Sequence, residues 1–244
     1  MSDRADSAEF QPLYAQVKDL LVRRIALGAW LPGAMLPNEF QLAAEYRVSQ
    51  GTVRKALLAM ESDQLIVRLQ GKGTYVAQHT KQRALYHFFR IVGLDGSQQI
   101  PTSHVLERKV QKATKQQASL LSIAAGSSLH AIKRLRDFDA EPVIFERIFV
   151  PLEFMPDLAV PIGVQRDEEM YVIYQQQFNI MIVRATERLA AVAATPEEAR
   201  LLRLDKGAPL IEITRLARDV SGRTVELRIS RVETAKCRYA AEIY

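Results

Sequence analysis

Apolar residues recur at helical spacing near the start of the chain, after Pro12. Proline suits the first turn of a helix, and Gly28 with the turn at 30–33 ends the pattern. An apolar stripe of this kind predicts an amphipathic helix with one buried face. That face carries Val17, Leu20, Leu21 and Ile25.

Two shorter helical patterns follow, joined by a tight turn at Arg47-Val48. The first, Glu39–Tyr46, begins after Asn38, which can cap the helix with Gln41 as its capping-box partner. The residues expected to be buried are Phe40, Leu42 and Ala43.

The second short helix begins after Ser49 as N-cap and runs from Gln50 to about Asp63. Strand-like segments at 65–69 and 74–76 then flank a glycine-rich tip at 70–73. Two helices followed by a hairpin are the layout of a winged helix-turn-helix, which places its second helix in the DNA major groove. Its inward-facing residues are Val53, Leu57 and Met60.

Candidate DNA contacts lie at the start of that second helix, where recognition helices reach base edges. Arg54 can fork onto guanine or a phosphate, and Gln50 can pair with adenine. Thr52 can touch a phosphate or a thymine methyl group, and Gly51 allows close approach of the backbone. For Arg54 alone, a surface salt bridge is the alternative interpretation.

The hairpin adds a second candidate contact surface. No acid occurs from residue 64 to residue 83, and the hairpin contributes Arg68, Gly71, Lys72 and Gly73. A basic tip of this kind can lie along a groove and bind phosphates. The alternative is a plain hairpin with a solvated lysine.

Beyond residue 85, strand-like runs alternate with helical patterns, and turns at 137–142 and 219–223 favour antiparallel hairpins. This mixture predicts an α+β domain. The predicted helices are Thr114–Leu121, Glu168–Phe178 and Pro196–Leu204. The predicted strands are Phe88–Leu94, Val105–Val110, Leu129–Phe138, Val143–Val150, Ile180–Leu189, Leu210–Asp219 and Thr224–Val232.

An internal repeat runs through this region. ATKQQASLLSIAAGSSLHAIKRLRD, from Ala113, aligns with ATPEEARLLRLDKGAPLIEITRLARD, from Ala194. Each copy reads as a helix, a glycine turn and a hairpin, so two copies can pair their sheets with pseudo-twofold symmetry. Chance similarity between two amphipathic segments is the alternative.

The two copies differ at charged positions. Arg134 and Arg136 share one face of a strand, because side chains alternate along it. Glu146 lies on the next strand and aligns approximately with Arg228, while Glu226 lies on the last strand of the second copy. Guanidiniums beside carboxylates suit a small ligand with an anionic group and a donor group. A charge ladder across surface strands is the alternative.

Composition narrows the class of protein. The 244 residues suit one large domain or two smaller ones, and 48% hydrophobic residues can bury a core. The single cysteine excludes an internal disulfide, and the four scattered histidines lack metal-ligand spacing. No apolar run approaches the roughly 20 residues that a membrane helix needs. The net charge of +5 gives mild support for a polyanionic partner.

The segment from about Pro12 to Val76 resembles a known family. The LP-x-E, VS-x-x-TVR-x-AL and GKGT-x-V elements occur in order between Pro12 and Val76. This run is similar to the DNA-binding domain of the GntR family of bacterial transcription regulators. The resemblance implies DNA contacts by Arg54, Thr52 and Gly71. It departs from the family at Asn38, where serine is usual, and at Gln50, where arginine is usual, which implies a shifted operator preference.

The remainder, from about Phe88 to Ile243, resembles the UTRA effector domain of HutC-type GntR regulators. The carrying elements are RLRD, EPVIFE-x-x-x-VP, GAPLIEITRLARD and a final RY. The resemblance implies a pocket lined by Arg134, Arg136 and Glu146. Further implied pocket residues are Ser103, Glu226, Arg228 and Tyr239. Glu169 departs from the family, which commonly has a small hydroxyl residue there.

The sequence therefore predicts an N-terminal winged helix-turn-helix (1–77), a linker (78–85) and a chorismate-lyase-like effector domain (86–244). We expect a cytoplasmic, homodimeric transcription regulator that represses from an inverted-repeat DNA operator and is released by a small polar or anionic metabolite. No cofactor, metal, membrane or catalytic residue is expected. The alternatives are an enzyme that acts on small acids and a DNA-binding protein without a ligand. The effector, the target genes, the dimer geometry and the choice between activation and repression are not specified by the sequence.

Overall fold

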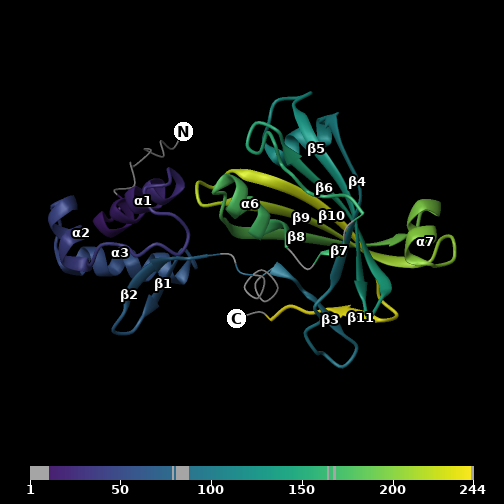
Figure 1. Cartoon of the computed structure of the whole chain (residues 1–244), viewed down its shortest axis with the longest axis horizontal. Coiled ribbons are helices and arrows are strands. Elements are labelled where there is room, and N and C mark those ends of the chain that lie inside the picture. Colours follow the sequence, from purple (N-terminus) through teal and green to yellow (C-terminus); the bar gives the residue numbers. More distant parts are fainter. Residues whose placement is uncertain (1–10, 79, 81–87, 164, 167–168, 243–244) are drawn as a thin grey trace, which may run out of the picture. The chain divides into compact units, whose positions relative to one another are not determined.

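The computed structural model of the chain describes residues 11–78, 80, 88–163, 165–166 and 169–242. The chain divides into two compact units, Met1–Gln78 and His79–Tyr244 (Figure 1). Most of the predicted linker at 78–85 lies outside the described residues.

The N-terminal unit is a winged helix-turn-helix, as predicted. Its helices are α1 (Leu13–Ala26), α2 (Glu39–Tyr46) and α3 (Gln50–Ser62), and α1 and α2 both pack on α3. The wing is the antiparallel pair β1 (Ile66–Leu69) and β2 (Gly73–Val76). The core of this unit gathers Val17, Leu21, Ile25, Leu36, Leu42, Val53, Leu57 and Met60.

Two side chains predicted to be buried are exposed instead. Leu20 is 46% exposed and Phe40 is 69% exposed. In α1 the buried residues are Val17, Leu21 and Ile25, four apart, so Leu20 lies about 100° away from Leu21 around the helix. Phe40 lies two residues from buried Leu42, a rotation of about 200° that puts it on the opposite side.

Helices α2 and α3 begin with the predicted caps. The side chains of Asn38 and Gln41 form a reciprocal capping box at the start of α2. Arg47 ends α2 with φ of 53°, in the left-handed region, and the Ser49 hydroxyl accepts a hydrogen bond from the Thr52 backbone N–H at 3.1 Å. These caps fix the angle at which the chain enters α3.

The C-terminal unit is built on a seven-stranded antiparallel sheet in the order β7-β4-β5-β6-β10-β9-β8 (Figure 1). Its helices are α5 (Lys115–Leu121), α6 (Met170–Phe178) and α7 (Pro196–Leu202). The strands of this sheet are β4 (Thr102–Lys112), β5 (Ser128–Phe138), β6 (Glu141–Pro151), β7 (Gln165–Arg166), β8 (Ile182–Ala193), β9 (Pro209–Asp219) and β10 (Thr224–Glu233).

A second, two-stranded sheet pairs β3 (Ile91–Gly93) with β11 (Cys237–Tyr239). Sequence patterns predicted a longer strand at 88–94 and did not predict β7 or β11. These strands are two or three residues long, too short to display an alternating pattern. The small sheet joins two segments about 145 residues apart, which no local signal can reveal.

The predicted repeat is present in the fold. The units β4-α5-β5-β6 and β8-α7-β9-β10 pair through their last strands, β6 and β10. Glu146 of β6 faces Ser230 of β10, and Arg228 faces Ile148. Because Arg228 is the counterpart of Glu146 and Ser230 that of Ile148, these two pairs are exchanged by a pseudo-twofold axis between the strands.

The helices of the two repeats also match. Thr114 with Gln117 and Thr195 with Glu198 form capping boxes at the starts of α5 and α7. The glycine turns that follow have φ of 79° at Gly126 and 83° at Gly207, which only glycine adopts without strain.

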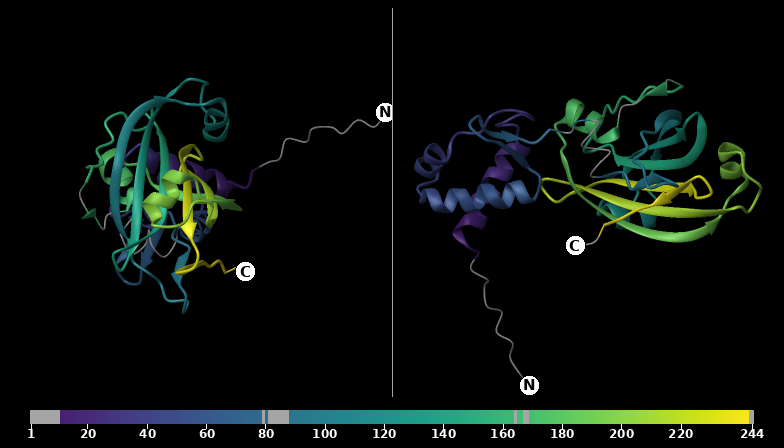
Figure 2. Two further views of the ribbon diagram at one scale, coloured as in Figure 1. Left: turned by 90° about the vertical axis from the view of Figure 1, so that its right-hand side faces the viewer. Right: turned by 90° about the horizontal axis from the view of Figure 1, so that it is seen from below.

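Hydrophobic side chains pack on both faces of the seven-stranded sheet. On one face, α5 packs over Ala131 and Phe149, and α7 packs over Phe145. On the other face, α6 covers Ile132 and Ile148, while β3 and β11 cover Ile144 and Ile213 (Figures 1 and 2). Polar side chains occupy the second face between α6 and the small sheet.

In the parts of the chain that the structure describes, no helix is long and apolar enough to cross a membrane. The same residues contain no group of three or more His, Cys, Asp or Glu side chains placed to hold a metal ion.

Candidate functional site

The exposed start of α3 is the first candidate site. Gln50, Gly51 and Arg54 are exposed, and the Thr52 hydroxyl lies 2.9 Å from that of Ser49. A Cβ atom on Gly51 would meet only the Ser49 hydroxyl oxygen, at 3.8 Å. The packing of the protein therefore does not require glycine there, and a close external partner is a better reason for it.

Glu39 links the recognition helix to the wing. Its carboxylate accepts from Arg54 Nε at 3.0 Å and from an Arg68 terminal nitrogen at 2.7 Å. The hydrogen bond from Arg54 lowers the pKa of Glu39. The Arg54 side chain still has 61% of its surface exposed. Salt bridge and DNA contact are therefore compatible: the carboxylate holds the guanidinium by one edge and leaves it open.

The tip of the wing is tightly turned. Gly71 and Gly73 have φ of 71° and 114°, and Lys72 between them is exposed. The Tyr75 hydroxyl donates to the Lys72 carbonyl at 2.9 Å. The left-handed backbone explains both glycines, so they form the turn whether or not they touch DNA.

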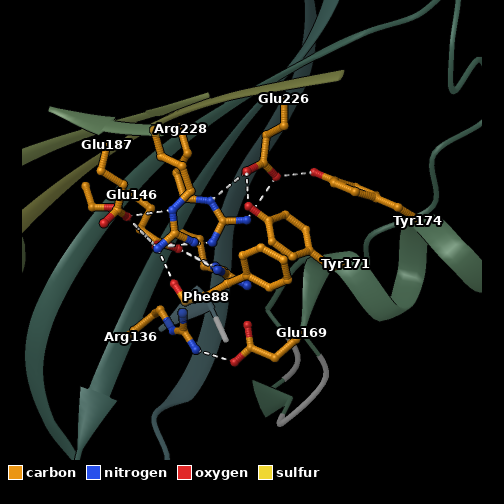
Figure 3. Close-up of polar contacts among 12 residues, drawn as sticks. Phe88, Arg136, Glu146, Glu169, Tyr171, Tyr174, Glu187, Glu226 and Arg228 are labelled. Atoms are coloured by element: carbon orange, nitrogen blue, oxygen red, sulfur yellow. Dashed lines mark hydrogen bonds and ion pairs between the residues drawn. The ribbon is translucent and has the colours of Figure 1, made fainter. Parts of the chain in front are cut away.

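The second candidate site is a network of arginines and carboxylates buried under α6 and the small sheet (Figure 3). Arg134 of β5 donates through Nε to Glu146 of β6 at 2.7 Å. Arg228 lies 3.6 Å from the same carboxylate and donates two hydrogen bonds to Glu226, at 3.0 and 2.9 Å. All four residues are less than 5% exposed. The surface charge ladder is therefore the wrong interpretation.

Helix α6 closes this network from above. The Tyr171 and Tyr174 hydroxyls donate to Glu226 at 3.3 and 2.6 Å (Figure 3). Burial, and next the Glu226 charge, raise the pKa of Tyr171 to about 12. Both tyrosines therefore stay neutral donors. They tie α6 to the sheet, and the sequence reading missed them because they sit in an apolar helical pattern.

A second ion pair lies towards the small sheet. Arg215 of β9 donates through Nε to Glu187 of β8 at 2.7 Å, and the Tyr239 hydroxyl of β11 donates to the same carboxylate at 2.5 Å. Arg215 also donates to the Phe88 carbonyl. Sequence reasoning did not predict this pair. The repeat aligns Arg215 with Arg134, a signal that could have indicated Arg215, whereas Glu187 carried no such signal.

Arg136 has a separate partner. It donates through Nη2 to Glu169, the residue that precedes α6 (Figure 3). The Cζ atom of Arg136 also lies 4.5 Å from the centre of the Phe89 ring. Its Nε is buried without a hydrogen-bond partner among the described residues. Burial lowers the pKa of Arg136 to about 10, and the Glu169 charge offsets part of that effect.

These groups surround one hollow with a free volume of about 320 Å³, counted out to its open mouth. Arg136, Arg215 and Arg228 bring positive charge to its wall, and Glu146 and Glu187 bring negative charge. The rest of the lining is Phe89, Arg90, Ile91, Ile144, Ile213, Ser230, Val232 and Tyr239. A wall of this kind suits a small polar ligand with an apolar flank.

The predicted effector residues are largely brought together. Arg136, Glu146, Arg228 and Tyr239 line the hollow, and Arg134 and Glu226 support it from behind. Ser103 is buried opposite Arg136 on the neighbouring strand and does not line the hollow.

Two family models match the chain. The model of bacterial regulatory proteins of the gntR family matches residues 13–76, and that of the UTRA domain matches residues 97–238. Together they cover the winged helix-turn-helix and most of the sheet domain with its buried network.

Curated relatives extend over nearly the whole chain. The HTH-type transcriptional regulator YurK of Bacillus subtilis is 34% identical over 84% of this chain and 85% of its own length. The HTH-type transcriptional repressor NagR of the same species is 30% identical over 84% and 83%. The histidine utilization repressor of Pseudomonas putida is 29% identical over 87% and 84%.

Solved structures agree with these relatives. The C-terminal domain of Yurk from Bacillus subtilis has a TM-score of 0.51 and 28% identity, covering 55% of this chain and 90% of that one. PhnF from Mycobacterium smegmatis has a TM-score of 0.55 and 19% identity, covering 93% and 98%, which supports the fold alone.

A winged helix-turn-helix joined to an effector domain defines a DNA-binding transcription regulator, not an enzyme. The chain belongs to the GntR family and carries a UTRA domain.

Proposed function

We propose that this regulator acts as a homodimeric repressor in the cytoplasm and releases its operator when a small polar or anionic metabolite binds the UTRA hollow. The observation that carries the proposal is a hollow walled by three buried arginines in the same chain as an exposed recognition-helix start. Relatives named as repressors, NagR among them, support repression over activation.

The proposed DNA contacts are the exposed groups at the start of α3 and on the wing. Arg54 and Gln50 face bases, Thr52 and Lys72 face phosphates, and Gly51 permits close approach. Asn38, Ser49 and Arg68 support them: two cap helices, and Arg68 shares Glu39 with Arg54. Gly71 and Gly73 shape the wing tip.

A dimer follows from the small size of one recognition surface. One helix-turn-helix makes few base contacts, whereas two of them read paired half-sites. The operator is therefore an inverted repeat with its half-sites on one face of the DNA. Gln50 at the usual arginine position shifts the base preference from guanine towards adenine.

The experiment is a selection of bound duplexes from a random pool with the full chain, followed by release with a panel of metabolites. We expect an inverted repeat to be enriched. At least one sugar phosphate or organic acid should release this DNA from the protein and be recovered chemically unchanged. Enrichment of no sequence by folded protein at moderate salt contradicts the proposal. Conversion of the releasing compound to a product would favour an enzyme.

A further inference from the structure

Arg136 lines the hollow, and its partner Glu169 lies behind the lining rather than in it. We propose that Glu169 is a resident carboxylate that occupies half of an anion-binding edge on Arg136, and that the acid group of the effector displaces it. This inference rests on the proposed effector function of the same hollow.

The geometry of the guanidinium supports this assignment. Nε–H and Nη2–H lie on one edge of an arginine and together bind a carboxylate or phosphate side-on. Glu169 takes Nη2, while Nε is buried and without a partner among the groups that the structure describes. A buried N–H donor left unpaired is costly, so an acid group that takes both nitrogens gains over Glu169.

The other buried guanidiniums at the hollow are already occupied. Arg228 donates two hydrogen bonds to Glu226, and Arg215 holds Glu187 and the Phe88 carbonyl. Arg134 is committed to Glu146. Arg136 is therefore the buried lining arginine with an edge to spare, and Phe89 beneath it holds the guanidinium plane in place.

Charge balance points the same way. Four arginines (134, 136, 215 and 228) meet four glutamates (146, 169, 187 and 226) through the hydrogen bonds and ion pairs of this network. Removing Glu169 from the cluster leaves one positive charge unmatched in a poorly solvated site. An incoming anion restores the balance, whereas a cation does not. The effector class is therefore an organic acid, either a carboxylate or a phosphate.

Release of Glu169 has a route to the rest of the domain. Glu169 is the N-cap residue of α6, and its side chain makes no capping hydrogen bond there. After release, its charge can lie at the helix N-terminus, where acids are favoured, which lowers the cost of the exchange. The first turn of α6 then loses its anchor to β5, while Tyr171 and Tyr174 still hold Glu226.

The test uses full-length protein with ¹⁵N-labelled arginine, in which the Nε–H signal of Arg136 reports its own hydrogen bond. Arg136→Lys identifies the signal by its loss. Inorganic phosphate and acetate are titrated separately into the wild type, Glu169→Gln and Glu107→Gln. Glu107 is the matched control, a half-buried glutamate of β4 paired with lysines elsewhere on the sheet.

We expect Glu169→Gln to reach half-maximal shift of the Arg136 signal at roughly one tenth of the wild-type anion concentration, since the competitor is weakened. Glu107→Gln should titrate as the wild type does. If the Arg136 signal responds to phosphate and not to acetate, the acid group of the effector is a phosphate. If the signal responds to acetate too, the site accepts a carboxylate. Equal midpoints in wild type and Glu169→Gln, or no response to either anion, overturn the inference.

A replacement variant and a comparison with the DNA-release experiment separate failure of the Glu169 role from failure of the proposed function. If Glu169→Gln does not fold, Glu169→Asp replaces it, because the shorter acid cannot hold Nη2 at the same distance and should also titrate at lower concentration. If a metabolite releases DNA but the midpoints are equal, the effector function stands and the role of Glu169 fails. If the midpoints differ but no metabolite releases DNA, the regulatory proposal fails and Glu169 remains a competitor.

Discussion

At the scale of single residues, Arg54 is the sharpest test of DNA recognition. Its guanidinium is fixed by Glu39 yet mostly open. We expect Arg54→Ala to abolish specific operator binding. One bidentate arginine carries about 1–3 kcal/mol of base discrimination, so its loss from both protomers weakens specific binding by about 30-fold or more. Gel shifts with specific and random duplexes measure this.

The control for Arg54→Ala is the melting temperature. An exposed ion pair contributes little to folding, so the temperature should change by no more than a few degrees. Retained specific affinity in a folded variant would remove Arg54 from the groove.

Gly51 gives a complementary test. Gly51→Ala should fold at least as well as the wild type, since alanine favours a helix by about 1 kcal/mol over glycine and the site has room. Operator affinity should fall about tenfold or more if DNA comes close to this backbone. Fluorescence anisotropy on one operator measures it; unchanged affinity would assign Gly51 no contact.

Glu146 tests the buried network. Burial alone would raise its pKa, but Arg134, Arg228 and Arg136 together hold the pKa well below the usual value. Removing one member of a buried charge pair costs about 3–5 kcal/mol, so Glu146→Ala should melt far below the wild type. Calorimetry measures the loss.

The lowered pKa of Glu146 also predicts how the stability of the folded protein depends on pH. Because the folded pKa of Glu146 is lowered, its contribution to stability is present above the unfolded value and declines as pH falls towards the folded one. The stability difference between wild type and Glu146→Ala should therefore shrink on acidification. A difference that grows below pH 4 would contradict this sign.

Single residues also show where sequence reasoning stops. Arg134, Arg136 and Glu146 were found because alternation along one hairpin puts them on a common face. Glu169 lies 33 residues from Arg136 and Tyr239 lies 52 residues from Glu187. Their meeting depends on how α6 and β11 fold back over the sheet, which no local pattern encodes. Leu20 and Phe40 were wrongly predicted to be buried, because each helix has more apolar residues than its buried face holds.

At the scale of elements, the two capping boxes of the repeat offer a matched pair. Thr114→Ala and Thr195→Ala remove equivalent hydroxyls from α5 and α7. Each should cost about 1 kcal/mol, the usual value for a lost N-cap. Thr195→Ala should cost the more, because Glu198 of that box is buried and close to Arg231. Denaturant unfolding of both variants measures the difference; a larger loss at Thr114 would contradict it.

At this scale the sequence predicted most of the fold. Six long strands and three helices of the sheet domain lie within a few residues of their predicted bounds, since each is long enough to display its period. The order of strands was not predicted beyond the pairing of two repeats. The edge pairing of β7 with β4 and the second sheet depend on contacts between distant segments.

At the scale of the whole molecule, association with DNA should be strongly salt dependent. The winged unit is not strongly basic overall, so binding depends on where a few basic groups, such as Lys72, lie. If each of two protomers neutralises three phosphates, the slope of log K against log salt is about −5. Anisotropy titrations at several salt concentrations measure it. Lys72→Ala in both protomers should make the slope shallower by about 2; an unchanged slope would remove the wing from the backbone.

The two halves of the sheet meet at Glu146 and Arg228, which occupy equivalent places and lie 3.6 Å apart with opposite charge. Halves of identical sequence would have set two acids, or two bases, against each other at the centre of the domain. Divergence at this position replaces that repulsion with an attraction between opposite charges, and it makes the two sides of the hollow chemically different.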